Sequence, residues 1–176
     1  MTDPSARADP PVAAGVAVPP GGAVPAGLPG AADARPSGDL CDWLRGEWTI
    51  TRRINENEGR FEGHARFTPD PNAPATLIWH EHGHLRLGGH QGTAERTLRI
   101  EPAAHGAWQV RFADGRPFHV LDLTAGSCEA RHPCGADVYR GRYAVDGPDR
   151  FVVTWRVAGP RKDDVIESVY VRRTCR

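Results

Sequence analysis

The chain has 176 residues and carries 22 basic and 22 acidic side chains, so its formal net charge at pH 7 is zero. That length allows one domain with a sizeable core. The balanced charge provides no field that would attract nucleic acid or an anionic membrane surface, and we expect neither as a partner. The sequence contains no uninterrupted run of apolar side chains long enough to indicate a membrane-spanning helix.

Residues 1–39 differ in composition from the rest of the chain. They contain eight of the sixteen prolines, many alanines and glycines, and a single leucine. So little apolar side chain cannot offset the entropy lost on ordering, and we expect a disordered tail over 1–39 and one folded domain over 40–176. The tail has no basic start followed by a continuous apolar stretch, which predicts a cytoplasmic protein. In that compartment the four cysteines are expected to be reduced thiols.

The folded part is expected to begin with a short helical turn and to continue as β-strands. Asp39 or Asp42 can cap a turn through Leu40, Trp43 and Leu44, which would cover one end of a barrel. Alternating polar and apolar residues then predict strands over residues 46–54, 60–68, 75–87, 91–101, 107–113, 117–124, 136–145, 150–158 and 164–173.

Nine strands are the minimum that this pattern predicts, and two connections are expected to be longer than the others. These are residues 69–74, which contain three prolines, and residues 125–135. The pattern predicts an all-β fold, a closed antiparallel up-and-down barrel of about nine or ten strands whose first and last strands meet. A barrel of this size has room for one small ligand, so the inward-facing side chains are the candidate site.

Two hairpins have turns short enough to set their register. The Gly-Gly turn at 88–89 places Glu81 opposite Arg96, on the face that also carries the apolar pairs of that hairpin. Either charge buried alone would be strongly destabilising, so we expect these two to form an ion pair. The Asp-Gly turn at 114–115 likewise places His119 on the inner face.

The first hairpin predicts a different environment for an arginine. A turn through residues 55–59 would set Trp48 opposite Phe67 and Arg52 opposite Gly63. Arg52 would then face a residue without a side chain and have free space beside it. A fixed guanidinium in such a space suits a carboxylate or phosphate group.

The expected interior combines aromatic and aliphatic side chains with convergent polar groups, as small-molecule sites do. Asp137, Tyr139 and Tyr143 alternate onto the inner face, because the next strand has a clearly apolar face to pair with them. On the last strand the period leaves open which of two faces points inward. The candidate ligand-binding residues are Arg52, Glu81, Arg96, His119, Asp137, Tyr139, Tyr143, Tyr170 and Arg172.

The two ends of the folded part carry a recognisable combination. Gly46-Glu47-Trp48 on the first strand, together with a basic residue on the last strand, resembles the signature of calycin barrels, the lipocalin and fatty-acid-binding group. The resemblance implies a calycin-like barrel in which Arg172 points inward and packs across the tryptophan, a mainly structural role. The expected interior is more charged than that of a typical fatty-acid carrier.

A second resemblance is more specific and covers about residues 40–173. The stretches 44–48, 115–119, 132–139 and 155–162 are similar to a family known only as a domain of unknown function. That resemblance implies a calycin-like barrel and supplies no activity, substrate or cofactor.

Two groups of possible metal ligands have simpler interpretations. His80, His82 and His84 project from one face of a strand, but it is the outer face, where solvated histidines are expected. The segment 132–134 (His-Pro-Cys) lacks the paired Cys-x-x-Cys spacing of a structural zinc site and is expected in a loop over the barrel mouth. We therefore predict no metal site. Haem bound through His119 is a weaker alternative, and the cofactor stays open.

Two functions from different classes fit this interior. The first is a soluble binding protein for one anionic or amphipathic molecule, with Arg52 as the anion anchor and neighbouring polar groups fixing its orientation. The second is a small barrel enzyme, a lyase, isomerase or cyclase, in which Glu81 or His119 moves a proton while Tyr139 and an arginine hold a carboxylate. The identity of the ligand, the presence of a reaction and the oligomeric state stay open.

Overall fold

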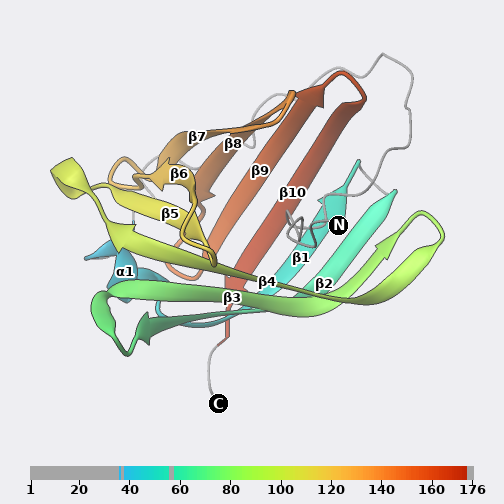
Figure 1. The fold of residues 1–176 in the computed structure, drawn as a ribbon. Helices are drawn as coiled ribbons and strands as arrows, with labels where there is room; N and C mark the ends of the chain where they lie inside the picture. Colours follow the sequence, from blue (N-terminus) through green and yellow to red (C-terminus); the bar gives the residue numbers. More distant parts are fainter. Residues whose placement is uncertain (1–35, 37, 56–57, 174–176) are drawn as a thin grey trace, which may run out of the picture.

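The computed structural model describes residues 36, 38–55 and 58–173. The tail predicted over 1–39 lies almost wholly outside the described residues. Within them the fold is all-β apart from a short α-helix and a 3₁₀ turn, and ten antiparallel strands form a nearly closed barrel (Figure 1). The predicted fold class is confirmed. None of the described helices is long and apolar enough to span a lipid bilayer.

All nine predicted strands are present, and a tenth lies where a loop was expected. The elements are α1 (Leu40–Leu44), β1 (Gly46–Ile54), β2 (Gly59–Asp70), β3 (Ala73–Leu87), β4 (His90–Pro102), η1 (Ala104–Gly106), β5 (Trp108–Phe112), β6 (Pro117–Leu121), β7 (Ser127–Cys134), β8 (Asp137–Val145), β9 (Arg150–Gly159) and β10 (Lys162–Arg172).

The barrel closes between its first and last strands and stays open between two middle ones. The strand order is β6-β5-β4-β3-β2-β1-β10-β9-β8-β7, so β1 pairs with β10 as predicted. Among the described residues, β6 and β7 lie at the two ends of this order and share no backbone ladder. The His132 ring spans that gap, with Nδ1 3.0 Å from the carbonyl oxygen of Phe118.

Helix α1 covers the end of the barrel where β1 begins. Asp39 caps the helix by accepting a hydrogen bond from the backbone N–H of Cys41 at 2.8 Å. Trp43 is buried and contacts Trp48 edge-on, with ring centroids 5.4 Å apart. Arg172 seals the same end, because its guanidinium lies 4.2 Å from the Trp48 ring and donates to the backbone carbonyls of α1 and its C-cap. This end of the barrel is therefore filled.

The registers of the two tight hairpins are confirmed, but that of the first hairpin is wrong by two residues. Arg52 pairs with Phe61 and not with Gly63, since the strands continue closer to the turn than expected. A shift of two leaves every side chain on its predicted face, because strand side chains alternate with period two. Gly63 and Gly83 instead face each other under the Phe61 ring, where a Cβ would lie within 3 Å of that ring.

Both connections that were predicted to be long are shorter than expected. Residues 69–74 mostly belong to β2 and β3, with a register shift between Pro69 and Asp70 that accommodates the prolines. Residues 125–135 contain β7, whose inner face carries small or polar residues and therefore shows no apolar alternation. Pro133 is tolerated there because β7 is an edge strand, where a missing N–H breaks no ladder.

Candidate functional site

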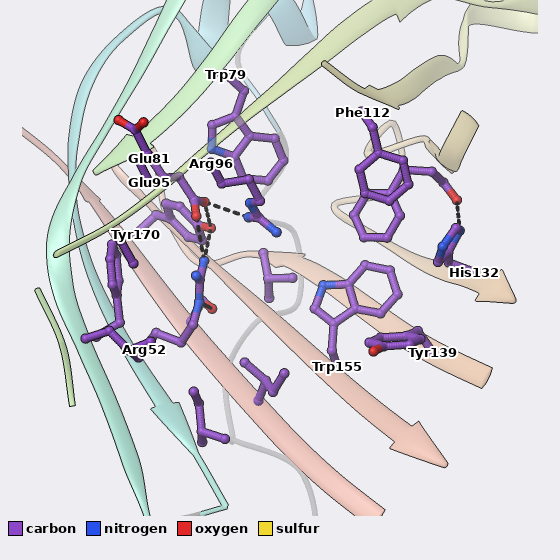
Figure 2. Close-up of a pocket in the computed structure, with 18 of the residues that line it drawn as sticks. Arg52, Trp79, Glu81, Glu95, Arg96, Phe112, His132, Tyr139, Trp155 and Tyr170 are labelled. Carbon is purple, nitrogen blue, oxygen red and sulfur yellow. Dashed lines mark hydrogen bonds and ion pairs between the residues drawn. The ribbon is translucent and has the colours of Figure 1, made fainter. Parts of the chain in front are cut away.

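A cavity of about 320 Å³ lies inside the barrel, and every strand contributes at least one residue to its lining. The lining starts at Arg52 on β1 and at Phe61 on β2, which are the strand halves remote from α1. The barrel is therefore packed at the α1 end and hollow at the other. Figure 2 shows two sides of this cavity, one with Arg52, Glu81, Arg96 and Tyr170, the other with Phe112, His132, Tyr139 and Trp155.

The polar side is a buried carboxylate held by two guanidinium groups. Glu81 is 1% exposed and accepts hydrogen bonds from Arg52 Nη2 at 2.9 Å and from Arg96 Nη2 at 2.8 Å. The Tyr170 hydroxyl donates to the same carboxylate at 2.6 Å, and Arg52 Nε donates to Ser168 Oγ at 2.8 Å. The sequence predicted the pair of Glu81 with Arg96; the structure adds the second arginine.

These contacts fix the charge of the cluster. Burial by itself raises the pKa of Glu81, but the charges of Arg52 and Arg96 and the hydrogen bond from Tyr170 outweigh it and hold the pKa at about 2. Burial raises the pKa of Tyr170, and the neighbouring Glu81 charge raises it further, so the phenol stays neutral. One negative and two positive groups leave a net charge of +1 beside the cavity.

The two arginines have hydrogen-bond donors to spare. A guanidinium carries five N–H donors, and Arg96 uses one nitrogen, Nη2, in this cluster. Its Nε is buried and unpaired, as is Nε1 of Trp79, over whose ring the Arg96 guanidinium lies at 5.4 Å. Arg52 makes its hydrogen bonds to Ser168, Glu81 and Tyr170 through Nε and Nη2. Buried unpaired donors such as Arg96 Nε are destabilising, so stability alone does not account for this arrangement.

The other side of the cavity is aromatic. Phe118 stacks on Trp155 with ring centroids 5.2 Å apart, and Phe112 and His132 pack around Phe118. Trp155 lies flat against Gly141 of the neighbouring strand, where a Cβ would come within 2.7 Å of the indole ring. The missing side chain at this position therefore sets how far the aromatic wall reaches into the cavity.

A tyrosine and a histidine form a pair behind the polar side. Tyr143 lines the cavity and is 2% exposed, and its hydroxyl lies 2.9 Å from Nε2 of His119. His119 Nδ1 lies 3.0 Å from the carbonyl oxygen of Val120. Burial lowers the pKa of His119 to about 4, and the nearby charge of Arg96 also lowers it, so the imidazole is neutral. Both ring nitrogens are occupied, which leaves neither for a haem iron.

The cavity mouth carries Lys162, the first residue of β10. Lys162 forms an ion pair with Asp137 at 2.8 Å, and a hydrogen bond with Tyr139 helps to raise the pKa of the lysine, after the larger effect of Asp137. Cys134 lines the mouth as well. These residues place a compensated cation at the entrance.

Six of the nine residues predicted from the sequence meet in this cavity: Arg52, Glu81, Arg96, Tyr139, Tyr143 and Tyr170. The other three lie outside its lining. His119 stands behind Tyr143, Asp137 holds Lys162 at the mouth, and Arg172 lies on Trp48 at the filled end. The face of β10 that the sequence left open is now clear, since Tyr170 is 1% exposed.

Sequence reasoning missed four lining residues in particular. Ser168 and Ile166 share the face of Tyr170 and Arg172, which the resemblance sets inward, so both could have been added to the candidate residues. Phe118 and His132 come from the two strand edges that fail to pair. Alternation next to the inward His119 assigns Phe118 to the outer face, and β7, which carries His132, was not predicted as a strand. A search for aromatic residues flanking a missing ladder would have found them.

The histidines of β3 lie where the sequence predicted. His80, His82 and His84 stand opposite Thr97, Glu95 and Thr93 on the outer face. Across residues 36–173, gaps excepted, no group of three or more His, Cys, Asp or Glu side chains is arranged to hold a metal ion.

Fold and cavity together define the class: a ten-stranded antiparallel barrel that is packed at one end and encloses a mixed polar and aromatic cavity at the other. Residues 44–172 match the family of unknown function DUF6314, so the chain belongs to that family. The predicted resemblance to such a family is confirmed. No curated protein matches the sequence.

Several solved structures are similar to this barrel, and the one with a TM-score above 0.5 supports its architecture. The S-type phycobiliprotein lyase CPES from Guillardia theta is similar with a TM-score of 0.61 and 7% identity, over 78% of this chain and 92% of that one. A de novo designed fluorescence-activating β-barrel has a TM-score of 0.46 and 14% identity, over 78% and 100%. The redesigned barrel mFAP1, bound to DFHBI, has a TM-score of 0.44 and 14% identity, over 77% of this chain and 100% of that one. At these identities the likeness concerns the fold alone.

Proposed function

We propose that this protein binds one small anionic molecule inside the barrel. The observation that carries the proposal is the cluster of Arg52 and Arg96 on one buried carboxylate, facing the cavity inside the barrel. An anionic group of the ligand would accept hydrogen bonds from the unpaired guanidinium donors, and its apolar part would lie against Trp155 and Phe118.

Charge and burial support this assignment. The Arg52 and Arg96 side chains are 17% and 22% exposed, so they interact with a ligand in a medium of lower dielectric than water. Glu81 holds both guanidiniums in place and neutralises only one of them. A monoanion bound there would complete the charge balance, whereas a cation or a neutral molecule would not.

Binding is better supported than proton-transfer catalysis. A general acid or base at neutral pH works best with a pKa near 7. Three of the cavity's titratable groups are far from that value: the pKa of Glu81 is about 2, and burial raises the pKa of Tyr143 and of Tyr170. His119, behind Tyr143, has a pKa of about 4. Each of these groups keeps one protonation state near neutrality, so they orient a ligand and do not exchange protons with it.

The proposed location is the cytoplasm. Cys41, Cys128 and Cys134, the three cysteines within the described residues, are free thiols, which fits a reducing compartment.

Fluorescence titration with 8-anilinonaphthalene-1-sulfonate, an aromatic anion, tests the proposal. We expect saturable 1:1 binding to the wild type that Arg52→Met weakens by about 10-fold to 100-fold, the worth of a hydrogen bond to a charged group. Arg111→Met is the matched control, because Arg111 is an ion-paired arginine outside the cavity and its loss should leave the affinity unchanged. Absent binding, or equal affinity of wild type and Arg52→Met, would overturn the proposal.

A further inference from the structure

We infer that Tyr143 selects, among anionic ligands, those that carry an N–H or O–H hydrogen-bond donor, because His119 takes the hydroxyl hydrogen of Tyr143 and leaves only oxygen lone pairs for a ligand. The inference rests on the proposed function and specifies its ligand class. His119 is then a positioning residue, and Tyr143 is the residue that contacts the ligand.

The direction of each hydrogen bond follows from its partner. A backbone carbonyl can only accept, so the contact of His119 Nδ1 with the oxygen of Val120 at 3.0 Å places the ring hydrogen on Nδ1. The neutral ring then has a lone pair on Nε2, which lies 2.9 Å from the Tyr143 hydroxyl. The hydroxyl must therefore donate to His119.

The surroundings keep His119 in this state. The ring is 4% exposed and the charge of Arg96 acts on it, and both effects oppose a second proton on the imidazole. A protonated ring would donate from Nε2 and reverse the hydroxyl of Tyr143. Since burial and a positive neighbour both disfavour that state, the hydroxyl keeps one orientation near neutral pH.

Tyr143 lines the same cavity as Arg52, Arg96 and Glu81. The charges of Arg96 and Glu81 are among those that act on its phenol. The hydroxyl of Tyr170 donates to Glu81 and already accepts a hydrogen bond from Arg52 at 3.2 Å. Of these two phenols, Tyr143 therefore has the greater acceptor capacity left for a ligand.

Together these groups define a ligand with two polar features. One is an anionic group for the donors of Arg96 and Arg52, and the other is a hydrogen-bond donor for Tyr143. Aromatic acids with a ring N–H have this pattern and a flat body that suits the wall of Trp155 and Phe118.

Calorimetric titration with two nearly isosteric acids tests the inference on the full-length protein. Indole-3-acetate has a ring N–H, and 1-benzofuran-3-acetate has an oxygen at that position. We expect the wild type to bind the indole at least about fivefold more tightly, the worth of one hydrogen bond whose loss leaves a partner unsatisfied. In Tyr143→Phe the two acids should bind with equal affinity.

Variants of His119 separate selection from simple structural support. His119→Gln can still accept the hydroxyl hydrogen through its amide oxygen, so the preference for the indole should persist. His119→Leu frees the hydroxyl to donate, and the preference should disappear or reverse in favour of the benzofuran. A purely structural role would weaken both acids alike and leave their ratio unchanged.

The outcomes distinguish the two proposals. Equal affinity of the wild type for both acids, or a preference that survives Tyr143→Phe, would overturn the role of Tyr143 and leave the anion site standing. Failure of both acids, and of 8-anilinonaphthalene-1-sulfonate, to bind would overturn the proposed function and this inference with it.

Discussion

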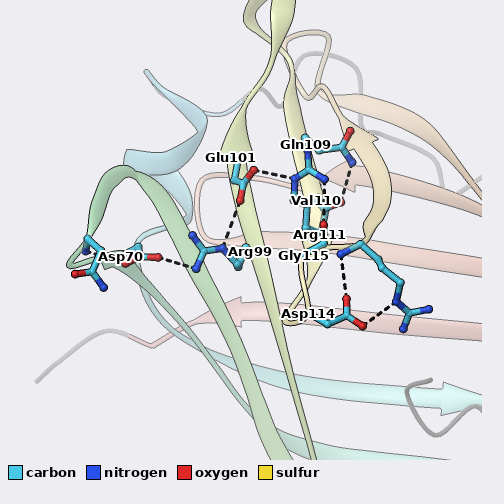
Figure 3. A network of polar contacts seen from close by, with 10 residues as sticks. Asp70, Arg99, Glu101, Gln109, Val110, Arg111, Asp114 and Gly115 are labelled. Carbon is cyan, nitrogen blue, oxygen red and sulfur yellow. Dashed lines mark hydrogen bonds and ion pairs between the residues drawn. The ribbon is translucent and has the colours of Figure 1, made fainter. Parts of the chain in front are cut away.

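Two networks of acids and arginines on this barrel use the same chemistry for different ends. On the outer face, Asp70, Arg99, Glu101 and Arg111 alternate in sign along a chain of ion pairs (Figure 3). On the inner face, Arg52 and Arg96 share the single acid Glu81. The outer chain has two charges of each sign and is complete, whereas the inner cluster has one positive charge in excess.

Burial sharpens this difference. In the outer chain the side chains of Arg99, Glu101 and Arg111 are 29% to 34% exposed and solvent screens their interactions, while Asp70 at its end is 5% exposed. In the inner cluster all three members are less exposed than those three, with Arg52 at 17%, Arg96 at 22% and Glu81 at 2%. Surface ion pairs contribute little to stability, while an uncompensated charge in a buried cluster is strongly destabilising. A barrel built for stability alone would not keep an unbalanced cluster inside. The comparison therefore supports the proposal that the inner network is the binding site.

The largest expected effect comes from removing the shared acid. Glu81→Gln would leave two buried guanidiniums side by side without a counter-charge, and we expect it to lower the free energy of unfolding by about 3–5 kcal/mol in urea titrations. Glu101→Gln is the matched change in the outer network and should lower it by less than about 1 kcal/mol. Similar losses for both variants would break the comparison.

The pH dependence of stability is the next largest effect. The pKa of His119 is about 4 in the folded protein and about 6.5 in an unfolded chain, so below pH 6.5 the unfolded state gains a proton that the folded state does not. The free energy of unfolding should therefore fall by up to about 3 kcal/mol between pH 6.5 and 4.

His119→Gln supplies the control for that profile, since it removes the titrating group from the same position. Most of this fall comes before Glu81 contributes, because a carboxylate with a folded pKa of about 2 loses its stabilising effect only below about pH 4.5. Denaturation curves of wild type and variant that stay parallel between pH 6.5 and 4.5 would contradict the assignment.

Packing of the aromatic wall gives an intermediate effect. Gly141→Ala would put a methyl group against the Trp155 ring, and we expect a loss of about 1–3 kcal/mol in the free energy of unfolding, with weaker binding of 8-anilinonaphthalene-1-sulfonate. Gly89→Ala, in the open turn between β3 and β4, has no heavy atom within 4 Å of the new Cβ and serves as the control. If Gly141→Ala changed neither the free energy of unfolding nor the binding of this anion, the aromatic wall would not be tightly packed against residue 141.

The smallest effect concerns the outer network itself. Arg111→Met should lower the free energy of unfolding by at most about 1 kcal/mol, and by still less in high salt, because exposed pairs are screened. The loss caused by Arg52→Met should depend much less on salt, since that pair is buried. Equal salt dependence of the two losses would remove the distinction between the networks.

The interior of this barrel was largely predictable where local rules apply. Strand side chains alternate with period two, and a two-residue turn sets a register, so the sequence alone places Glu81 opposite Arg96. Even the mistaken register of the first hairpin left Arg52 on the inner face, because the error was two residues. The side of the sheet on which a side chain lies is a local property, so the sequence alone indicates it.

Which inward groups meet from strands that do not form one hairpin was not predictable, because those contacts depend on how the sheet curves. Arg52 and Tyr170 reach Glu81 from strands 29 and 89 residues away along the chain. His119 was rightly placed inward, yet the structure sets it behind Tyr143 and outside the cavity lining. Strand β7 escaped detection because its inner side chains are small or polar, so only pairing with β8 defines it.

The amino-acid order by itself thus determined the all-β class, the inner face of the strands with clear alternation and two hairpin registers, since these follow from alternation and turn chemistry over a few residues. Only the tertiary structure decided that the end remote from α1 and Arg172 is hollow, and that two arginines share one acid there. Those features depend on the distances between strands far apart in the chain, which barrel closure sets and no local pattern records.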